Sequence, residues 1–469
     1  MSTIEKDSKK MREGQTVWLD AVDRTSASLK GAARSIANTL GASRPVLEEQ
    51  LFPPALAFSD LHIYQSVKKY NSIIEMFGLR NPFNRTHEGR LGATTISEGR
   101  ELVNFASYDY LSLNQEPAVA EAALAAIAQY GTSVSASRLV AGERPLHRAL
   151  ERELADFYEA EDCLTYVSGH ATNVSTIGVL MEPGDLIVYD ELMHNSGLMG
   201  AKLSRATSLS FAHNNLDALE KVLSENRGKH KNALILVEGL YSMDGDFPDL
   251  PRLIKIKKRY GAWLMVDEAH SLGVMGATGR GVAEHFHVDP RQVDIWMGTL
   301  SKTLGSCGGY ICGNRGLIDL LKHHSPGYVY SVGLSPPGAA AALAALKTLK
   351  AQPERVARMQ QNGRLFLEEA RAAGLDVMTS AGYSVVPVMV GDPVRAMRLT
   401  ANLDQRGFNV LPIIFPAVPM KAARLRFFIT SSHTPEQIRR AVRVTAEEIV
   451  SVAKKQSLVE RAALAVVVR

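Results

Sequence analysis

The chain has little cysteine, no long apolar run and little net charge, and each absence excludes a class of protein. Its 469 residues contain only three cysteines, Cys163, Cys307 and Cys312, each in or beside an apolar, strand-like run. We expect buried thiols in a reducing compartment, and neither a disulfide framework nor a metal site. No stretch approaches the roughly eighteen consecutive apolar residues that favour a membrane span.

The balance of charge excludes two further classes. The formal net charge of +4 is small for this length, and no block of lysine and arginine stands out. Nucleic acid is therefore not an expected partner. Residues 1–10 are polar and of mixed charge, and no apolar segment follows them. This argues against a secretory signal and favours the cytoplasm.

The body of the chain has the pattern of an α/β protein. Strand-like and helix-like segments alternate over residues 102–349, which favours a mostly parallel sheet covered by helices. A smaller C-terminal α/β domain is expected over residues 350–469, and residues 61–101 are expected to form an N-terminal arm. The strands predicted in the large domain are residues 163–167, 186–189, 234–238, 263–267, 293–297 and 310–312.

The first sixty residues differ from the rest. Apolar residues from Trp18 to Leu40 fall roughly at helical spacing, and Gly41 and Pro45 offer a stop. Residues 1–60 are therefore predicted to be a helical extension. It is either an appendage packed on the main body or a docking surface for a carrier protein or a second subunit.

Two residues with reactive side chains stand at the expected carboxyl ends of strands, where such sheets bind ligands. Asp267 ends the run 263–267, and Lys302 lies in a hydroxyl- and glycine-rich loop after the run 293–297. This pair suits pyridoxal phosphate: the lysine would form a Schiff base, and the aspartate would keep the pyridine nitrogen protonated. The alternatives are a solvated surface lysine and an aspartate that caps the next turn.

Several motifs around this pair resemble the α-oxoamine synthases, which are pyridoxal phosphate-dependent transferases of fold type I. They are Asp267-Glu268-Ala269-His270-Ser271-Leu272-Gly273, the glycines between Gly276 and Gly281, and Gly298-Thr299-Leu300-Ser301-Lys302. The resemblance covers about residues 81–452. It implies pyridoxal 5'-phosphate as the cofactor, a large domain with a seven-stranded type of sheet, and a homodimer with shared active sites.

The resemblance also assigns roles around the cofactor. Lys302 would be the Schiff-base lysine and later the base, and Asp267 the partner of the pyridine nitrogen. His270 would contact the phenolic oxygen, Ala269 would lie beneath the ring, and His194 would stack on its opposite face. Further cofactor contacts are implied for Ser168, Gly169 and His170 at a helix start, Ser242 near the phenolic oxygen, Thr299 and Ser301 near the phosphate, and Ser331 from the partner subunit.

Three residues are candidates for binding substrate. Arg426 resembles the arginine that grips the amino acid's carboxylate, the alternative being a structural ion pair, and Arg424 is expected to face the other way. The Ser137 region departs from the family because Ser133 and Ala136 replace glycines. The segment Tyr108-Asp109-Tyr110-Leu111-Ser112-Leu113 resembles another family motif, and Asp109 is the candidate to replace an asparagine that the family has there.

The function implied by the resemblance is an acyltransferase reaction. A small amino acid (glycine, alanine or serine) would condense with an acyl thioester of coenzyme A or an acyl carrier protein. In most of the family carbon dioxide then leaves, and the product is an α-amino ketone. Two other interpretations stay open: a pyridoxal phosphate-dependent aminotransferase with the same lysine, aspartate and arginine, and a non-catalytic partner subunit.

Overall fold

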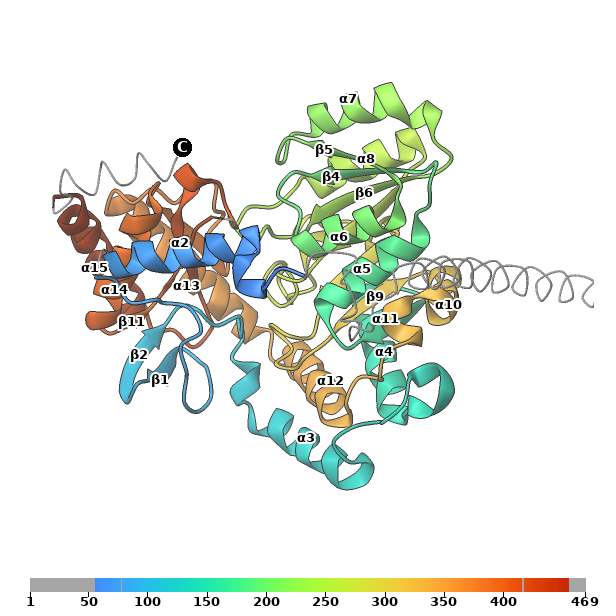
Figure 1. The fold of residues 1–469 in the computed structure, drawn as a ribbon. Coiled ribbons are helices and arrows are strands. Elements are labelled where there is room, and N and C mark those ends of the chain that lie inside the picture. Colours follow the sequence, from blue (N-terminus) through green and yellow to red (C-terminus); the bar gives the residue numbers. More distant parts are fainter. Residues whose placement is uncertain (1–54, 77, 416, 455–469) are drawn as a thin grey trace, which may run out of the picture. The chain divides into compact units, whose positions relative to one another are not determined.

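The computed structural model describes residues 55–76, 78–415 and 417–454 (Figure 1). The chain divides into two units, residues 1–70 and 71–469. The first contains the short helix η1 (Phe58–Asp60) and the start of α2 (His62–Met76), where Ile63 and Val67 are exposed. The helix expected between Trp18 and Leu40 lies outside the described residues.

The second unit is built on a seven-stranded sheet, as the sequence predicts. The strand order is β3-β9-β8-β7-β6-β4-β5, and only β9 runs antiparallel to its neighbours in this sheet. The strands are β3 (Asp162–Tyr166), β4 (Leu186–Asp190), β5 (Thr207–Phe211), β6 (Ala233–Glu238), β7 (Trp263–Asp267), β8 (Ile295–Thr299) and β9 (Gly309–Gly313). Each predicted strand is confirmed to within two residues at either end.

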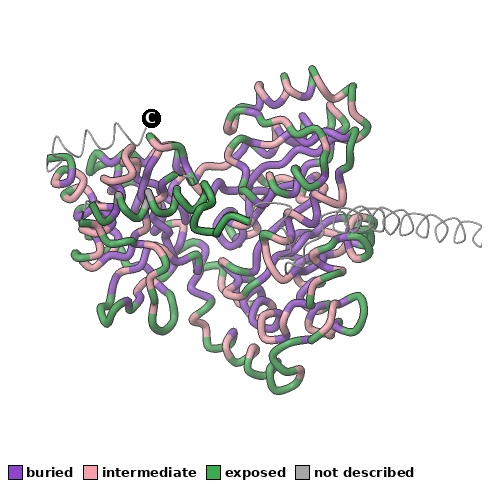
Figure 2. The backbone as a smooth tube through the Cα atoms, in the orientation of Figure 1, coloured by how far each residue is buried: buried purple, intermediate pink, exposed green. Residues whose placement is uncertain are grey.

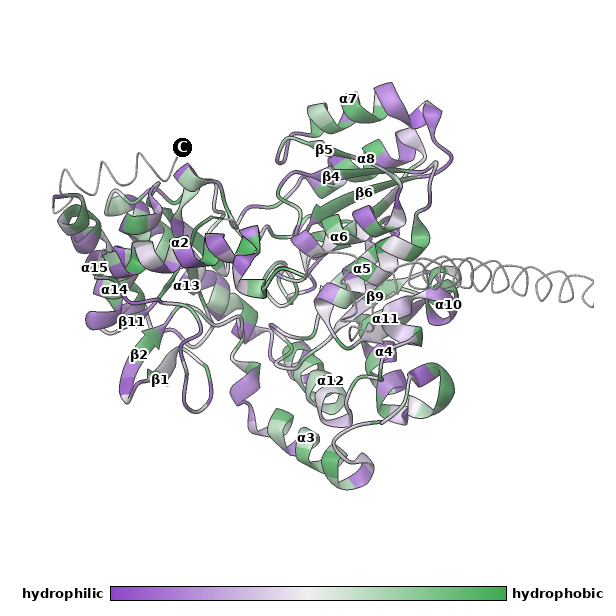
Figure 3. Cartoon of the chain, in the orientation of Figure 1, coloured by the Kyte–Doolittle hydropathy of each residue, from purple (hydrophilic) through white to green (hydrophobic). Residues whose placement is uncertain are grey.

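Helices cover both faces of this sheet because its strands are apolar on both faces. On β6, Leu234 and Leu236 join one buried cluster, and Ile235 and Val237 join the other. Burying each such side chain stabilises the fold by about 1.5–3 kcal/mol. Figure 2 shows the strands buried, and Figure 3 shows the hydrophobic strands β4 and β6 between helices. One face carries α4 (Pro145–Tyr158), α7 (Leu216–Asn226), α8 (Leu250–Tyr260) and α12 (Pro336–Ala351); the other carries α5 (Gly169–Leu180), α6 (Asn195–Ser204), α10 (Arg315–His324) and α11 (Pro326–Val329).

Two smaller sheets and a third buried cluster form the C-terminal part. The sheets have the orders β10-β13-β12 and β1-β2-β11. The domain boundary predicted at residue 102 falls inside β2, which pairs with β11. Phe105, just after β2, packs in the buried cluster of the C-terminal part. The elements are β1 (Thr94–Ser97), β2 (Arg100–Asn104), β10 (Val385–Met389), β11 (Phe408–Asn409), β12 (Leu411–Ile413), β13 (Arg424–Phe428), α13 (Glu354–Ala372), α14 (Pro393–Gln405) and α15 (Pro435–Lys454).

Two further α-helices connect these parts: α3 (Pro117–Tyr130), which packs on α12, and α9 (Val282–His285). Within the described ranges, no helix has the length and apolarity needed to cross a membrane.

The cysteine prediction is partly wrong. Cys163 and Cys312 are buried free thiols, opposite each other on β3 and β9, as expected. Cys307, however, is exposed. It lies two residues before β9, in the loop that turns at Gly305 with φ +56°, so it is outside the buried strand that follows it.

Candidate active site

A cavity of about 230 Å³ lies where β6, β7 and β8 reach their carboxyl ends. Parallel α/β sheets bind ligands at this edge. Ten of the predicted site residues line it: Ser168, Gly169, His170, His194, Asp267, Ala269, His270, Thr299, Ser301 and Lys302. Segments up to 134 residues apart in sequence, from Ser168 to Lys302, therefore meet in one place.

Lys302 is held by a neutral histidine inside this cavity. Its Nζ lies 2.7 Å from Nε2 of His270, and Nδ1 of His270 lies 2.7 Å from the hydroxyl of Tyr110. Burial lowers the pKa of His270 well below its usual range, and nearby Lys302 lowers it further. Burial also lowers the pKa of Lys302 to about 8, although Asp267 and Glu238 oppose this effect. The amine is therefore able to exchange a proton near neutral pH.

Asp267 is buried and held by two neutral donors. Oδ1 accepts a hydrogen bond from the Ala269 N–H at 2.9 Å, and Oδ2 accepts one from the Asn173 amide at 2.8 Å. Because Asn173 stands on α5, the start of that helix fixes the carboxylate as well as forming the cavity wall.

His194 is the N-cap of α6 and lines the cavity from that side. Its Nδ1 lies 2.6 Å from the hydroxyl of Ser196 and accepts a hydrogen bond from the Ser196 N–H at 3.3 Å. Burial lowers the pKa of His194, opposed by Asp267. The neutral imidazole ring is thus fixed in orientation, which stacking on a flat ligand requires.

The other end of the cavity suits an anion. Ser168 is the N-cap of α5, and its hydroxyl accepts a hydrogen bond from the Ala171 N–H at 3.4 Å. Thr299 and Ser301 place hydroxyls beside this helix start, where both donate to the carbonyl of Gly308. Free N–H groups at a helix start attract phosphate and carboxylate groups.

Arg426 and Ser242 lie together, beside the lining just described. Nη1 of Arg426 donates to the carbonyl of Ser242 at 2.9 Å, and its guanidinium lies 4.6 Å from the ring centroid of Phe428. The expectation for Arg424 is wrong. Residues two apart on a strand share a face, and Arg424 binds the same segment, through the Met243 carbonyl and the Asp244 carboxylate.

Asp109 is outside the cavity lining and serves the backbone. Its carboxylate accepts hydrogen bonds from the N–H groups of Leu113 (2.8 Å) and Asn114 (3.2 Å). Burial raises its pKa to about 6, although these hydrogen bonds oppose the effect. The preceding residue, Tyr108, is the one that approaches Lys302, whose Nζ lies 5.7 Å from its ring centroid.

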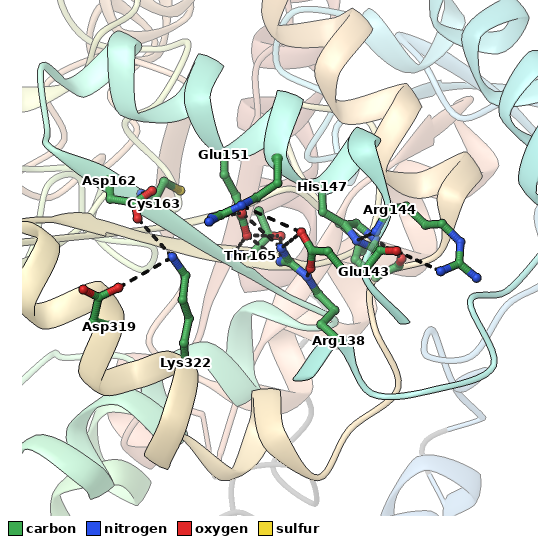
Figure 4. A network of polar contacts seen from close by, with 12 residues as sticks. Arg138, Glu143, Arg144, His147, Glu151, Asp162, Cys163, Thr165, Asp319 and Lys322 are labelled. Carbon is green, nitrogen blue, oxygen red and sulfur yellow. Dashed lines mark hydrogen bonds and ion pairs between the residues drawn. The ribbon is translucent and has the colours of Figure 1, made fainter. Parts of the chain in front are cut away.

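Ser137 and Ser331 also lie outside the cavity and come together elsewhere, in a shallow hollow between residues 135–137 and 329–332. Figure 4 shows what anchors this region: Arg138 lies between Glu143 and Glu151. A buried charge needs such partners. The network therefore fixes the backbone next to Ser137.

Four lining residues escaped the sequence interpretation: Asn173, Ser196, Glu238 and Met297. Glu238 and Met297 end predicted strands. Because such sheets bind ligands at the carboxyl ends of their strands, both residues could have been predicted to line the site. Asn173 lies within α5 and Ser196 in the first turn of α6, and no residue pattern distinguishes them from ordinary polar positions.

Pyridoxal phosphate fits these residues. The cavity offers an amine from Lys302 and the α5 helix start for a phosphate. It also offers the carboxylate of Asp267, which is only 5% exposed and whose hydrogen-bond donors are both neutral. A carboxylate that is buried this deeply is stabilised by a cationic partner, and a protonated pyridine nitrogen is such a cation.

Comparisons with known sequences agree with this assignment. The family model "Aminotransferase class I and II" matches residues 100–444. A protein from Geobacter sulfurreducens named 8-amino-7-oxononanoate synthase is 40% identical over 365 residues, which are 77% of this chain and 92% of that protein. A putative 8-amino-7-oxononanoate synthase from Parvibaculum lavamentivorans is 40% identical over 361 residues, 77% of this chain and 91% of the relative.

Solved structures are similar over most of the chain. A serine palmitoyltransferase from Sphingomonas wittichii has a TM-score of 0.80 and 27% identity, and covers 86% of this chain and 100% of its own. An 8-amino-7-oxononanoate synthase from Francisella tularensis has a TM-score of 0.66 and 27% identity, with 75% and 98% coverage. The chain therefore belongs to the aminotransferase class I and II family and, within it, to the α-oxoamine synthases, pyridoxal phosphate-dependent enzymes of fold type I.

Proposed function

We propose that this protein condenses a small amino acid with an acyl thioester and releases the thiol and carbon dioxide, giving an α-amino ketone. The observation that carries the proposal is the amine of Lys302, 2.7 Å from a neutral His270, in one cavity with the buried carboxylate of Asp267. The names of the relatives, 8-amino-7-oxononanoate synthase and serine palmitoyltransferase, support the reaction class.

The chain's own residues divide the work. When bound, pyridoxal phosphate supplies an aldehyde that reacts with amines and a ring that withdraws electrons. Lys302 is the amine that holds the cofactor and, with a pKa of about 8, the base that removes a proton from the substrate. His270 positions its Nζ, and Asp267 keeps the ring nitrogen protonated. His194 is the flat partner for the ring.

Arg426 is proposed to grip the substrate carboxylate. Its guanidinium lies near Tyr108, Tyr110 and Glu238, and only Nη1 makes a hydrogen bond in the described part of the chain, to the Ser242 carbonyl and the Met243 sulfur. A planar guanidinium binds a carboxylate through two parallel hydrogen bonds.

We further propose a homodimer and a cytoplasmic location. The hollow that holds Ser331 lies outside the main cavity, and Tyr330 beside it is 86% exposed, which supports a Ser331 that serves the partner subunit. The three free cysteines support a reducing compartment.

The test is chemical capture of Lys302. Borohydride reduction of the holoenzyme, followed by peptide mass spectrometry, should place the cofactor on residue 302. Lys302→Ala should lower kcat by at least about a thousandfold, since a base alone contributes about a hundredfold or more. Lys258→Ala, which removes an exposed lysine on α8, is the control.

The same preparation separates the alternatives. Glycine, alanine and serine are titrated in turn while the cofactor absorption is followed, and the thiol released from acyl-coenzyme A or acyl carrier protein is then measured. Transfer of the amino group to a 2-oxo acid without thiol release would indicate an aminotransferase. Absence of any cofactor absorption would indicate a non-catalytic partner subunit.

A further inference from the structure

Glu238 is a buried acid in the cavity wall that the proposed chemistry leaves without a role. It ends β6, is 2% exposed, and is paired in register with Asp267 on β7. Its Oε2 accepts a hydrogen bond from the Ser242 N–H at 3.2 Å. Its Oε1 has no hydrogen-bond partner within the described residues. An unpaired, buried oxygen in a ligand cavity indicates a group that the ligand completes.

The surrounding charges show which of the two carboxyl groups holds a proton. Burial raises the pKa of Glu238 to about 8, and neighbouring Asp267 raises it further, whereas Lys302 and the N–H groups of Ser242 and His194 oppose the effect. Arg426 on β13 and Tyr241 on the following loop also face this carboxyl. Two adjacent buried carboxyls do not ionise together readily.

The hydrogen bonds of the two carboxyl groups also indicate that Asp267 is ionised and that Glu238 holds the proton. Both oxygens of Asp267 accept hydrogen bonds, from Asn173 and Ala269, which stabilises its anionic form. Among the described residues, only Oε2 of Glu238 accepts a hydrogen bond, from the Ser242 N–H. A proton on Glu238 therefore belongs on Oε1, the oxygen without a partner.

We propose that Glu238 is a neutral carboxylic acid that donates a hydrogen bond from Oε1 to the bound pyridoxal phosphate, next to an anionic Asp267. This inference rests on the proposed function, because it requires the cofactor in this cavity. The neutral acid adds a hydrogen bond and leaves Asp267 as the negative partner of the ring nitrogen. An ionised Glu238 would add a second negative charge facing an anionic cofactor.

Glu268 provides a matched control. It is also a buried acid, directly after Asp267, and burial raises its pKa to about 7. Its Oε1 accepts a hydrogen bond from the Val282 N–H at 3.0 Å, and it does not line the cavity. Glu268→Gln should therefore leave the pH dependence of cofactor binding as in the wild type.

The experiment compares E238Q, E238L and E238A with the wild type. The dissociation constant of pyridoxal phosphate is measured by tryptophan fluorescence, and the absorption of the bound cofactor is followed, from about pH 6 to pH 9.5. At pH 7, E238L and E238A should bind about tenfold more weakly than E238Q, because glutamine keeps a donor and an acceptor. Above about pH 8, wild-type affinity should fall relative to E238Q, since glutamine does not ionise. Glu238 raises the pKa of Lys302, so the titration of Lys302 is followed separately in each variant through the pH dependence of the bound-cofactor absorption.

Two results would overturn the proposal. Binding by E238Q as weak as by E238L would mean that the charge is needed, and wild-type binding by both E238L and E238A would mean that no donor acts there. Unfolding temperatures of the cofactor-free proteins detect misfolding. Because the side chain in E238A is smaller than in E238L, weak binding by both variants excludes a steric clash of the leucine as the cause. Failure of the proposed function would show in the wild type alone, as a cofactor that borohydride does not fix on Lys302.

Discussion

Asn173 is a single side chain on which the orientation of Asp267 depends. Its amide donates to Asp267 Oδ2 at 2.8 Å and to Ser196 Oγ at 2.9 Å. Asn173→Ala should therefore weaken pyridoxal phosphate binding by about tenfold or more, since a hydrogen bond to a charged group contributes about 1.5–3 kcal/mol. Cofactor titration by tryptophan fluorescence measures the effect.

The control for this substitution stands half a turn further along α5. Ser175→Ala removes a hydroxyl that accepts a hydrogen bond from the Gly327 N–H at 3.0 Å, outside the cavity. It should change cofactor affinity by less than about twofold. Equal weakening in both variants would mean that α5 as a whole was disturbed, and the orientation of Asp267 would not be the cause.

At the scale of residues, sequence reasoning reached the groups that sit in distinctive motifs. Lys302 and Asp267 follow apolar runs, so their placement at strand ends could be predicted. The role of Asp109 could not, because a carboxylate between two tyrosines gives no indication of whether it faces a ligand or the N–H groups of Leu113 and Asn114. That depends on the left-handed turn at Ser112, φ +58°.

At the scale of elements, the start of α15 offers a quantitative test. The Thr434 hydroxyl accepts a hydrogen bond from the Gln437 N–H at 3.2 Å, and the Gln437 side chain accepts one from the Thr434 N–H at 2.9 Å. This reciprocal pair of hydrogen bonds is a capping box. Thr434→Ala should lower the free energy of unfolding by about 1 kcal/mol, measured by urea denaturation.

A double-mutant cycle with Gln437→Ala shows whether the two side chains act together. Because each hydrogen bond orients the partner's side chain, the double variant should lose less stability than the sum of the two single variants. Simple additivity would mean that the two hydrogen bonds are independent, and the box would not be a cooperative unit.

Elements with strong apolar patterns were predictable, and weakly patterned ones were not. The apolar strand β7 matches its predicted bounds, residues 263–267. Strand β5 was missed because it lies at the edge of the sheet, where its sequence Thr-Ser-Leu-Ser-Phe is mostly polar and exposed. Edge strands bury too little surface to need an apolar run.

At the scale of the whole molecule, His213 joins segments that are far apart in sequence. Its Nδ1 lies 2.8 Å from Oδ1 of Asp190, and its Nε2 lies 3.0 Å from Oδ2 of Asp246. Asp246 also accepts a hydrogen bond from Thr379 at 3.0 Å. A single imidazole therefore connects the end of β4, the loop after β6 and the segment before β10.

This cluster makes stability depend on pH. Burial alone would lower the pKa of His213, but hydrogen bonds to Asp190 and Asp246 outweigh it and raise the pKa to about 10. The folded-state value lies above the ordinary 6.5, so the stabilisation is fully present below about pH 6.5 and is lost as the pH rises through about 10. His213→Gln should cost about 2–4 kcal/mol at pH 7 and progressively less toward pH 10. Urea denaturation at both pH values measures this, with His324→Gln, an exposed histidine on α10, as the control. A cost for His213→Gln that is the same at both pH values would show that the imidazole is not charged in the folded protein.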